Sequence, residues 1–183
     1  VEVHQVNAGS SDLVMACSLE LEGGNLPGLS PGAPNNVAAA RLEFPPVWIN
    51  EVLPQNTVGL TDQAGEREPW IELVNQGSTP VDLGGWTLSN LSLVPGLWTF
   101  PPGTVIPGRG FLVVVADGEA SESRPPVELH AGFRLTAGSG SVFLSRPAGA
   151  GFEVADFMDY SGLAADESWV AIPDGQPFLR QRS

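Results

Sequence analysis

Residues 69–89 constrain the fold of this chain more than any other stretch. The run WIELVN at residues 70–75 is rich in aromatic, aliphatic and β-branched side chains, which favours a strand. In PVDLGGWTLS, apolar and polar residues alternate on both sides of Gly84 and Gly85. A period of two places the apolar members on one face of a sheet, and paired glycines are typical of a bulge or a sharp corner. We therefore expect strand segments on either side of a corner at Gly84-Gly85.

The pattern of residues 69–89 continues through most of the chain. About nine short apolar or alternating segments are separated by turn residues every eight to twelve positions or so, which predicts an all-β sandwich. The run FLVVVA at residues 111–116 is continuously apolar, and we expect a central strand that is buried on both faces. The predicted strands are residues 48–53, 70–74, 81–89, 97–100, 111–116, 129–135, 141–145, 154–160 and 169–172.

The N-terminal part of the chain has a different organisation. Val1 and Val3 alternate with polar residues, turn residues follow at 7–11, and residues 13–21 are strand-like again, which indicates a β-hairpin. Glycine, proline and asparagine then dominate GGNLPGLSPGAPNN, which is typical of a semi-rigid linker. We expect a hairpin fragment over residues 1–22, a linker over 23–46 and the β-sandwich over 47–183.

The charge and the cysteine content limit the kinds of partner that this chain can have. Twenty-one acidic residues against eight basic ones give a net charge of −13. Such a chain repels phosphate backbones, so nucleic acid is not expected as a partner. No segment contains the roughly 20 apolar residues that a membrane-spanning helix needs. The single cysteine, Cys17, has no internal disulfide partner and lies in an apolar run, where a buried hydrophobic role is favoured over a reactive thiol.

Several segments together resemble a known family. WIELVN, PVDLGGWTLS, WTFPPGTVIPGRGFLVVVADG, FRLTAGSGSVFLSR and SWVAIPDGQPF follow one another as in the lamin tail domain, an immunoglobulin-like β-sandwich. The resemblance covers about residues 47–183, and the Gly- and Pro-rich character of this segment resembles bacterial versions of the domain. Separately, VEVHQVNAGSSDLVMACSLELEG at residues 1–23 resembles the closing strands of a galactose-binding-type jelly roll.

The resemblance to lamin tail domains implies a function without catalysis. No catalytic motif belongs to that family, and its bacterial members are accessory modules of large exported proteins. It therefore implies an interaction module of a secreted or cell-surface protein, whose partners are other domains of the same parent chain or cell-surface components. The chain also begins within a strand pattern at Val1, which suggests that it is part of a longer protein.

Acidic residues give the candidates for a metal site and for hydrolysis. If a metal is bound, calcium held by loop oxygens of Asp62, Glu66 and Glu68 is the candidate. A pair of carboxylates could also hydrolyse glycosides if a groove held the pair about 5 to 9.5 Å apart. The nearby acidic sets are Glu66, Glu68 and Glu72, and Glu153, Asp156 and Asp159. Solvated faces and turn capping are the favoured interpretation of both sets. His130 is expected to form a structural hydrogen bond.

Exposed aromatic side chains would indicate a carbohydrate-binding module. Sugar rings stack on aromatic side chains that are displayed on a sheet face. We expect Trp48, Trp70 and Trp86 to pack in the core, because each lies within a strand beside other apolar residues. The remaining aromatic candidates for glycan binding are Trp98, Tyr160 and Trp169.

Replacement of Trp86 tests the predicted inner face of residues 80–89. If Trp86 anchors the core, Trp86→Ala removes a large buried side chain and leaves a cavity, so unfolding should become easier by about 3 to 5 kcal/mol. Urea denaturation followed by circular dichroism measures this change. A loss below about 1 kcal/mol would mean that Trp86 lies on the outer face.

Overall fold

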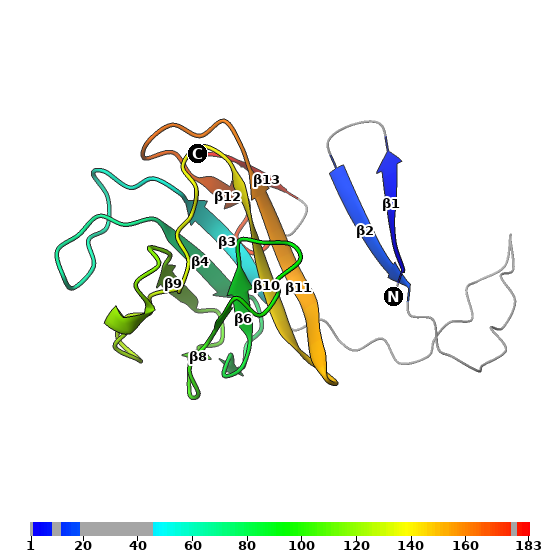
Figure 1. Ribbon diagram of the computed structural model, residues 1–183, viewed down its shortest axis with the longest axis horizontal. Helices are drawn as coiled ribbons and strands as arrows, with labels where there is room; N and C mark the ends of the chain where they lie inside the picture. The colour runs from blue at the N-terminus through cyan, green and yellow to red at the C-terminus, as the bar shows by residue number, and fades with distance from the viewer. Residues whose placement is uncertain (1, 9–11, 19–45, 177–178) are drawn as a thin grey trace, which may run out of the picture. The chain divides into compact units, whose positions relative to one another are not determined.

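The computed structural model describes residues 2–8, 12–18, 46–176 and 179–183, and it gives side-chain environments for the last two ranges. Contacts divide the chain into two units, Val1–Glu43 and Phe44–Ser183 (Figure 1). In the first unit, β1 (Glu2–Ala8) pairs antiparallel with β2 (Asp12–Ser18), which confirms the predicted hairpin. Most of the predicted linker, and the environment predicted for Cys17, lie outside the described part.

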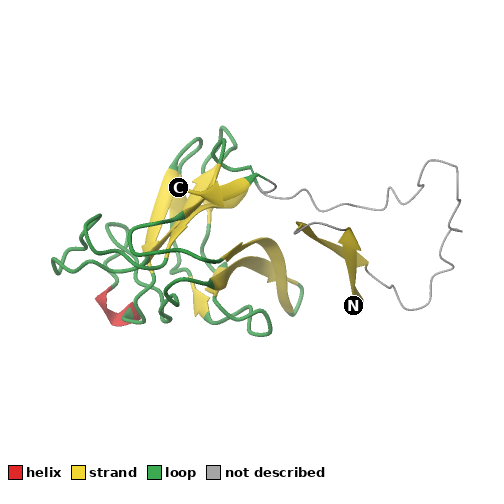
Figure 2. Ribbon diagram, turned by 90° about the horizontal axis from the view of Figure 1, so that it is seen from above, coloured by secondary structure: helices red, strands yellow, loops and turns green. Residues whose placement is uncertain are grey.

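The second unit is a β-sandwich of two principal sheets (Figures 1 and 2). One sheet has five strands in the order β13-β12-β3-β4-β9, and every neighbouring pair is antiparallel. Its strands are β3 (Val47–Leu53), β4 (Trp70–Asn75), β9 (Phe111–Val115), β12 (Trp169–Ala171) and β13 (Arg180–Arg182). The fold is therefore the predicted all-β, immunoglobulin-like sandwich.

The opposite sheet has four strands in the order β11-β10-β6-β7. Its strands are β6 (Thr87–Ser89), β7 (Trp98–Thr99), β10 (Gly140–Ala148) and β11 (Gly151–Tyr160). A short pair, β5 (Val81–Asp82) and β8 (Val105–Ile106), forms a separate ladder. The one helical segment among the described residues is a 3₁₀ turn, η1 (Ala120–Glu122).

Gly85 forms the corner that the paired glycines predict. β5 and β6 are neighbours along the chain but belong to different sheets. Gly85 has a φ of +83°, a conformation that glycine adopts without a steric penalty. Its N–H donates to the carbonyl of Phe100, and the N–H of Trp86 donates to the carbonyl of Leu83. The turn thus moves the chain from one ladder to the next while its backbone groups stay paired.

The core lies between the two principal sheets. Trp86 is 8% exposed and belongs to this core, so its predicted inward orientation is confirmed. Apolar residues of both sheets surround it, and the largest fully buried side chains are Phe100, Ile49, Ile71, Leu73, Leu83, Leu88, Ile106, Leu144 and Met158. Thr87 and Ser89 are also buried, and the cost is offset because their hydroxyls donate to the carbonyls of Pro95 and Leu91 in the next loop.

Two strand predictions are wrong in instructive ways. FLVVVA forms β9, but β9 is an edge strand of its sheet, and Phe111 is 47% exposed. Only its C-terminal end is covered, where the N–H of Val115 donates to the carbonyl of Leu129. Residues 129–135 form isolated bridges rather than a strand. A continuous apolar run therefore does not distinguish a central strand from an edge strand that a loop partly covers.

A buried ion pair joins the two sheets. Asp156 of β11 pairs with Arg180 of β13, and its Oδ2 also accepts the backbone N–H of Ile49 in β3 at 2.8 Å. Arg180 in turn donates to the carbonyls of Ile49 and Phe157. Burial raises the pKa of the Asp156 carboxyl, although Arg180 and the backbone donors oppose this effect. The prediction that Asp156 lies on a solvated face is therefore wrong.

Removal of one partner from the Asp156–Arg180 pair should be costly. Asp156→Ala leaves the Arg180 guanidinium buried without its carboxylate, which destabilises proteins by about 3 to 5 kcal/mol. Urea denaturation of the single variant measures the loss. The double variant Asp156→Leu, Arg180→Met removes both charges and should regain most of the stability. Equal losses in the single and double variants would contradict a role for the charges themselves.

Candidate functional site

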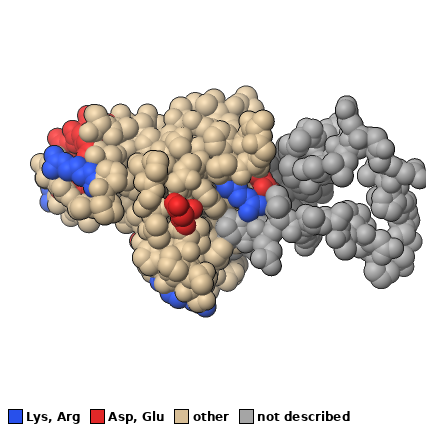
Figure 3. Space-filling model, turned by 90° about the horizontal axis from the view of Figure 1, so that it is seen from below, with Lys and Arg blue, Asp and Glu red and all other residues tan. Residues whose placement is uncertain are grey.

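Long loops meet at one end of the sandwich. Because Leu53 pairs with Trp70 and Trp70 pairs with Val115, the loop after β3 and the loop after β9 leave their sheet at the same end. We call residues 54–69 and 116–139 the loop end. Acidic and basic side chains gather at the left end of the surface in Figure 3, where Figure 1 places these loops, whereas the rest of that face carries few charges.

His130 is the buried centre of the loop end. Its Nδ1 lies 2.7 Å from Asp117 Oδ2, and its Nε2 lies 3.1 Å from Glu128 Oε1. The ring is 1% exposed. The backbone N–H of His130 donates to Ser123 Oγ at 2.8 Å, and a bridge to Val115 ties the residue to β9. The predicted structural hydrogen bond of His130 is thus confirmed, with two carboxylates as its partners.

The two carboxylates favour the charged form of His130. Burial lowers the pKa of the imidazole. The hydrogen bonds and charges of Asp117 and Glu128 raise this pKa by more than burial lowers it, so the pKa of His130 lies above its usual value. A protonated ring donates from both nitrogens and satisfies both acceptors. The surroundings of His130 therefore favour its protonation more than water does.

Asp62 belongs to the other loop of the same end. Its Oδ1 accepts the backbone N–H of Glu66 at 2.8 Å, whereas its Oδ2 is shielded from solvent and has no hydrogen-bond partner. The neighbouring N–H of Gln63 donates to Glu128 Oε2 at 3.1 Å, which joins the two loops. Residues about 65 positions apart in sequence are thus in contact.

Two groups of potential ligands lie side by side at the loop end. One ligand atom each from Asp62, Glu122 and His130 lies within 4.8 Å of the others, and the same holds for Glu66, Glu119 and Glu122. Desolvation and the nearby carboxylates of Asp62 and Glu119 raise the pKa of Glu66. The predicted calcium set is not brought together as one group. Asp62 and Glu66 fall into different groups, and Glu68 pairs with Arg134 instead.

The sequence prediction omitted Glu119, Glu122 and His130 from this cluster. They lie more than fifty positions from Asp62, and only the pairing of β4 with β9 brings the two loops together. The spacing of acidic residues within one loop carries no information about that pairing. The closely spaced acidic residues Asp117, Glu119 and Glu122, followed later in the same loop by His130, are the signal that the sequence offers.

The aromatic candidates do not form a shared platform. Tyr160 is 3% exposed and donates its hydroxyl to the carbonyl of Thr136 at 2.9 Å, and burial raises its pKa to about 12. Trp98 and Trp169 are half-buried and pack against the core from different sheets. All three side chains that the sequence offers as candidates for glycan binding therefore lie in or against the core.

Trp48 and Trp70 take the opposite position. Trp48 pairs with Val74 and Trp70 with Leu53, on the face of the five-stranded sheet opposite to Ile49, Leu73 and Ile71. Both tryptophans are half-buried, and neither belongs to the core. The prediction that they pack in the core is therefore wrong, because period-two alternation alone does not say which face of a sheet is inside.

The other acidic candidates have structural partners. Glu153 pairs with Arg146 at 2.9 Å, and Asp159 accepts the hydroxyl of Ser141 at 2.6 Å. Glu72 accepts the side-chain amide of Asn50, and desolvation raises its pKa. Asp156 is buried against Arg180. Each of these carboxylates therefore contacts a structural partner, and none of these partners is the second carboxylate that hydrolysis would require.

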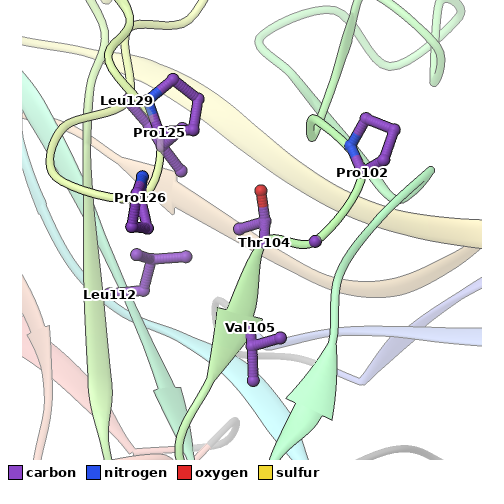
Figure 4. Close-up of a pocket in the computed structure, with 8 residues that line it drawn as sticks. Pro102, Thr104, Val105, Leu112, Pro125, Pro126 and Leu129 are labelled. Carbon is purple, nitrogen blue, oxygen red and sulfur yellow. The ribbon is translucent and has the colours of Figure 1, made fainter.

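A shallow pocket of about 240 Å³ opens between β8, β9 and the loop that follows β9 (Figure 4). Its lining residues are Pro102, Gly103, Thr104, Val105, Leu112, Pro125, Pro126 and Leu129, none of which titrates. It is smaller than ordinary small-molecule sites, which measure about 300 to 1,000 Å³. It therefore offers shape and apolar contact but no acid, base or nucleophile.

Comparison with protein families identifies the domain. Residues 43–167 match the family model of the lamin tail domain, and the chain belongs to this family of non-catalytic, immunoglobulin-like domains. The match does not reach residues 1–23, whose resemblance to a jelly roll stays a prediction. A search of curated proteins found no match. Within the described ranges, no helix is long and apolar enough to span a bilayer.

The stability of the domain should depend on the charge of His130. Its folded pKa is raised above the usual 6.5, so protonation stabilises the fold fully below about pH 6.5, and this contribution is lost as the pH rises through the folded pKa. Urea denaturation from pH 5.5 to 9 in the presence of a chelator measures the effect. In His130→Gln the free energy of unfolding should fall less over this pH window than in the unchanged chain. An equal fall in both proteins would contradict a stabilising role for protonated His130.

Proposed function

We propose that this domain is a non-catalytic interaction module of a larger exported bacterial protein, and that it attaches its parent to other protein domains or to the cell surface. The observation that carries the proposal is the division of the domain into a scaffold and a loop end. Membership of the lamin tail family supports an interaction role. Secretion or cell-surface location, and partners other than nucleic acid, are parts of the same proposal.

The scaffold suits such a role. The sandwich core and the Asp156–Arg180 pair hold the strands, whereas charged side chains gather at the loop end in the view of Figure 3. Rigid sandwiches commonly bind through their connecting loops. Glu66 and Glu119 are exposed there, and their carboxylates belong to one group together with Glu122. An acidic, solvent-facing group of this kind is complementary to a basic patch on a partner.

A binding experiment with matched variants tests the role of the loop end. The purified chain is titrated, by biolayer interferometry, against the remaining domains of its parent and against isolated cell envelopes, with duplex DNA as a comparison. Glu66→Gln, Glu119→Gln should weaken binding by about fivefold or more, since each lost charge contact contributes on the order of 0.5 to 1 kcal/mol.

The control variant removes the same charge elsewhere. Asp82→Asn, Glu153→Gln alters β5 and β11, outside the loop end, and should leave binding unchanged. Equal effects of the two variants would mean that net charge acts, not the loop end. The proposed function would be contradicted if the chain bound only DNA, or if it bound neither the parent domains nor the cell envelopes.

A carbohydrate-binding role is the second candidate, and Trp48 and Trp70 are its residues in this proposal. Trp48 and Trp70 lie on the outer sheet face, and the paired Glu51 and Glu72 lie between their positions. Aromatic rings beside carboxylates can stack on a sugar ring and accept its hydroxyls. Iodide quenching of tryptophan fluorescence against a polysaccharide panel tests this role. A glycan that protects tryptophan from iodide in the unchanged chain, but not in Trp70→Ala, would favour carbohydrate binding. If no glycan protects tryptophan, this role is excluded.

A further inference from the structure

We propose that the loop end binds one divalent transition-metal ion, of which Zn²⁺ is the representative, through Asp62, Glu122 and His130. One ligand atom of each residue lies within 4.8 Å of the other two. Ligands about 2.0 to 2.2 Å from a zinc ion lie roughly 3 to 4 Å apart, so small side-chain movements complete the site. The three residues come from two loops and from η1, so the ion would fasten the loop end together.

His130 is already oriented as a metal ligand. Zinc-bound histidines usually donate the second ring N–H to a carboxylate, which fixes the tautomer. Asp117 accepts from Nδ1 at 2.7 Å and its side chain is 1% exposed, so this orienting contact is buried. Nε2 lies 3.1 Å from Glu128 Oε1, so a metal ion bound at Nε2 would replace this hydrogen bond and would have the Glu128 carboxylate beside it as a further oxygen.

Asp62 supplies an independent indication of a ligand. Its Oδ2 is shielded from solvent, yet it has no hydrogen-bond partner, while its Oδ1 is occupied by the N–H of Glu66. Buried carboxylate oxygens without a partner are unusual, because their desolvation is not compensated. A cation bound at Oδ2 removes this deficit without any change in the hydrogen bond of Oδ1.

The donor set selects the class of ion. Calcium and magnesium prefer sites made of oxygen atoms alone, whereas imidazole nitrogen favours zinc and its neighbours in the first transition row. The group with His130 therefore differs from the outer group of Glu66 and Glu119, which is exposed and all-carboxylate. Only the inner group combines a buried nitrogen with carboxylates.

Calorimetric titration of the untagged chain with Zn²⁺ tests the proposal. Every protein sample in this experiment also carries His4→Gln and Cys17→Ser, so that the other histidine and the only cysteine cannot bind Zn²⁺. We expect one equivalent of Zn²⁺ to bind, and Ca²⁺ to bind more weakly. Asp62→Asn and His130→Gln should each weaken Zn²⁺ binding by about tenfold or more.

Glu119→Gln is the matched control, because it removes a carboxylate from the outer group alone. It should leave Zn²⁺ binding unchanged. Asp62→Asn keeps the oxygen that accepts the Glu66 N–H, so this variant decides the result if His130→Gln fails to fold. The proposal is overturned if no Zn²⁺ binds, if Asp62→Asn binds it normally, if Glu119→Gln weakens it equally, or if Ca²⁺ binds more tightly.

Discussion

The ion pair between Asp156 and Arg180 fixes how the two sheets of this lamin tail domain meet. Hydrophobic burial between sheets is not directional, so it would tolerate small slides of one sheet over the other. Asp156 removes that freedom, because its carboxylate accepts the N–H of Ile49 and pairs with Arg180 at the same time. Three strands, β3, β11 and β13, therefore share one polar contact inside an otherwise apolar interface.

The geometry of the loop end follows from the strand register within the five-stranded sheet. Once β3, β4 and β9 are in register, the loops that follow β3 and β9 leave the sheet together. His130 ties Asp117 to Glu128 within the second loop, and the N–H of Gln63 in the first loop donates to Glu128 and so links the two loops. Residues that are remote in sequence thus form one charged cluster at the loop end.

The sequence predicted the architecture better than the site. Alternation around Gly84-Gly85 located the strands and the corner, because both depend on local chemistry. It did not show which sheet face is inside, so Trp48 and Trp70 were assigned to the core and Tyr160 to the surface. The partners of His130 and Asp156 depend on contacts between distant strands, which no local pattern encodes.

Amide hydrogen exchange, followed residue by residue by NMR, tests most directly whether the two sheets are locked together through Asp156. The N–H groups of Ile49 and Phe157 both donate to this carboxylate. They should exchange only through global unfolding, and therefore as slowly as the central amides of β4. Exchange of these two amides at the rate of the exposed loop residues, while β4 stays protected, would show that the sheets separate locally and would contradict the account.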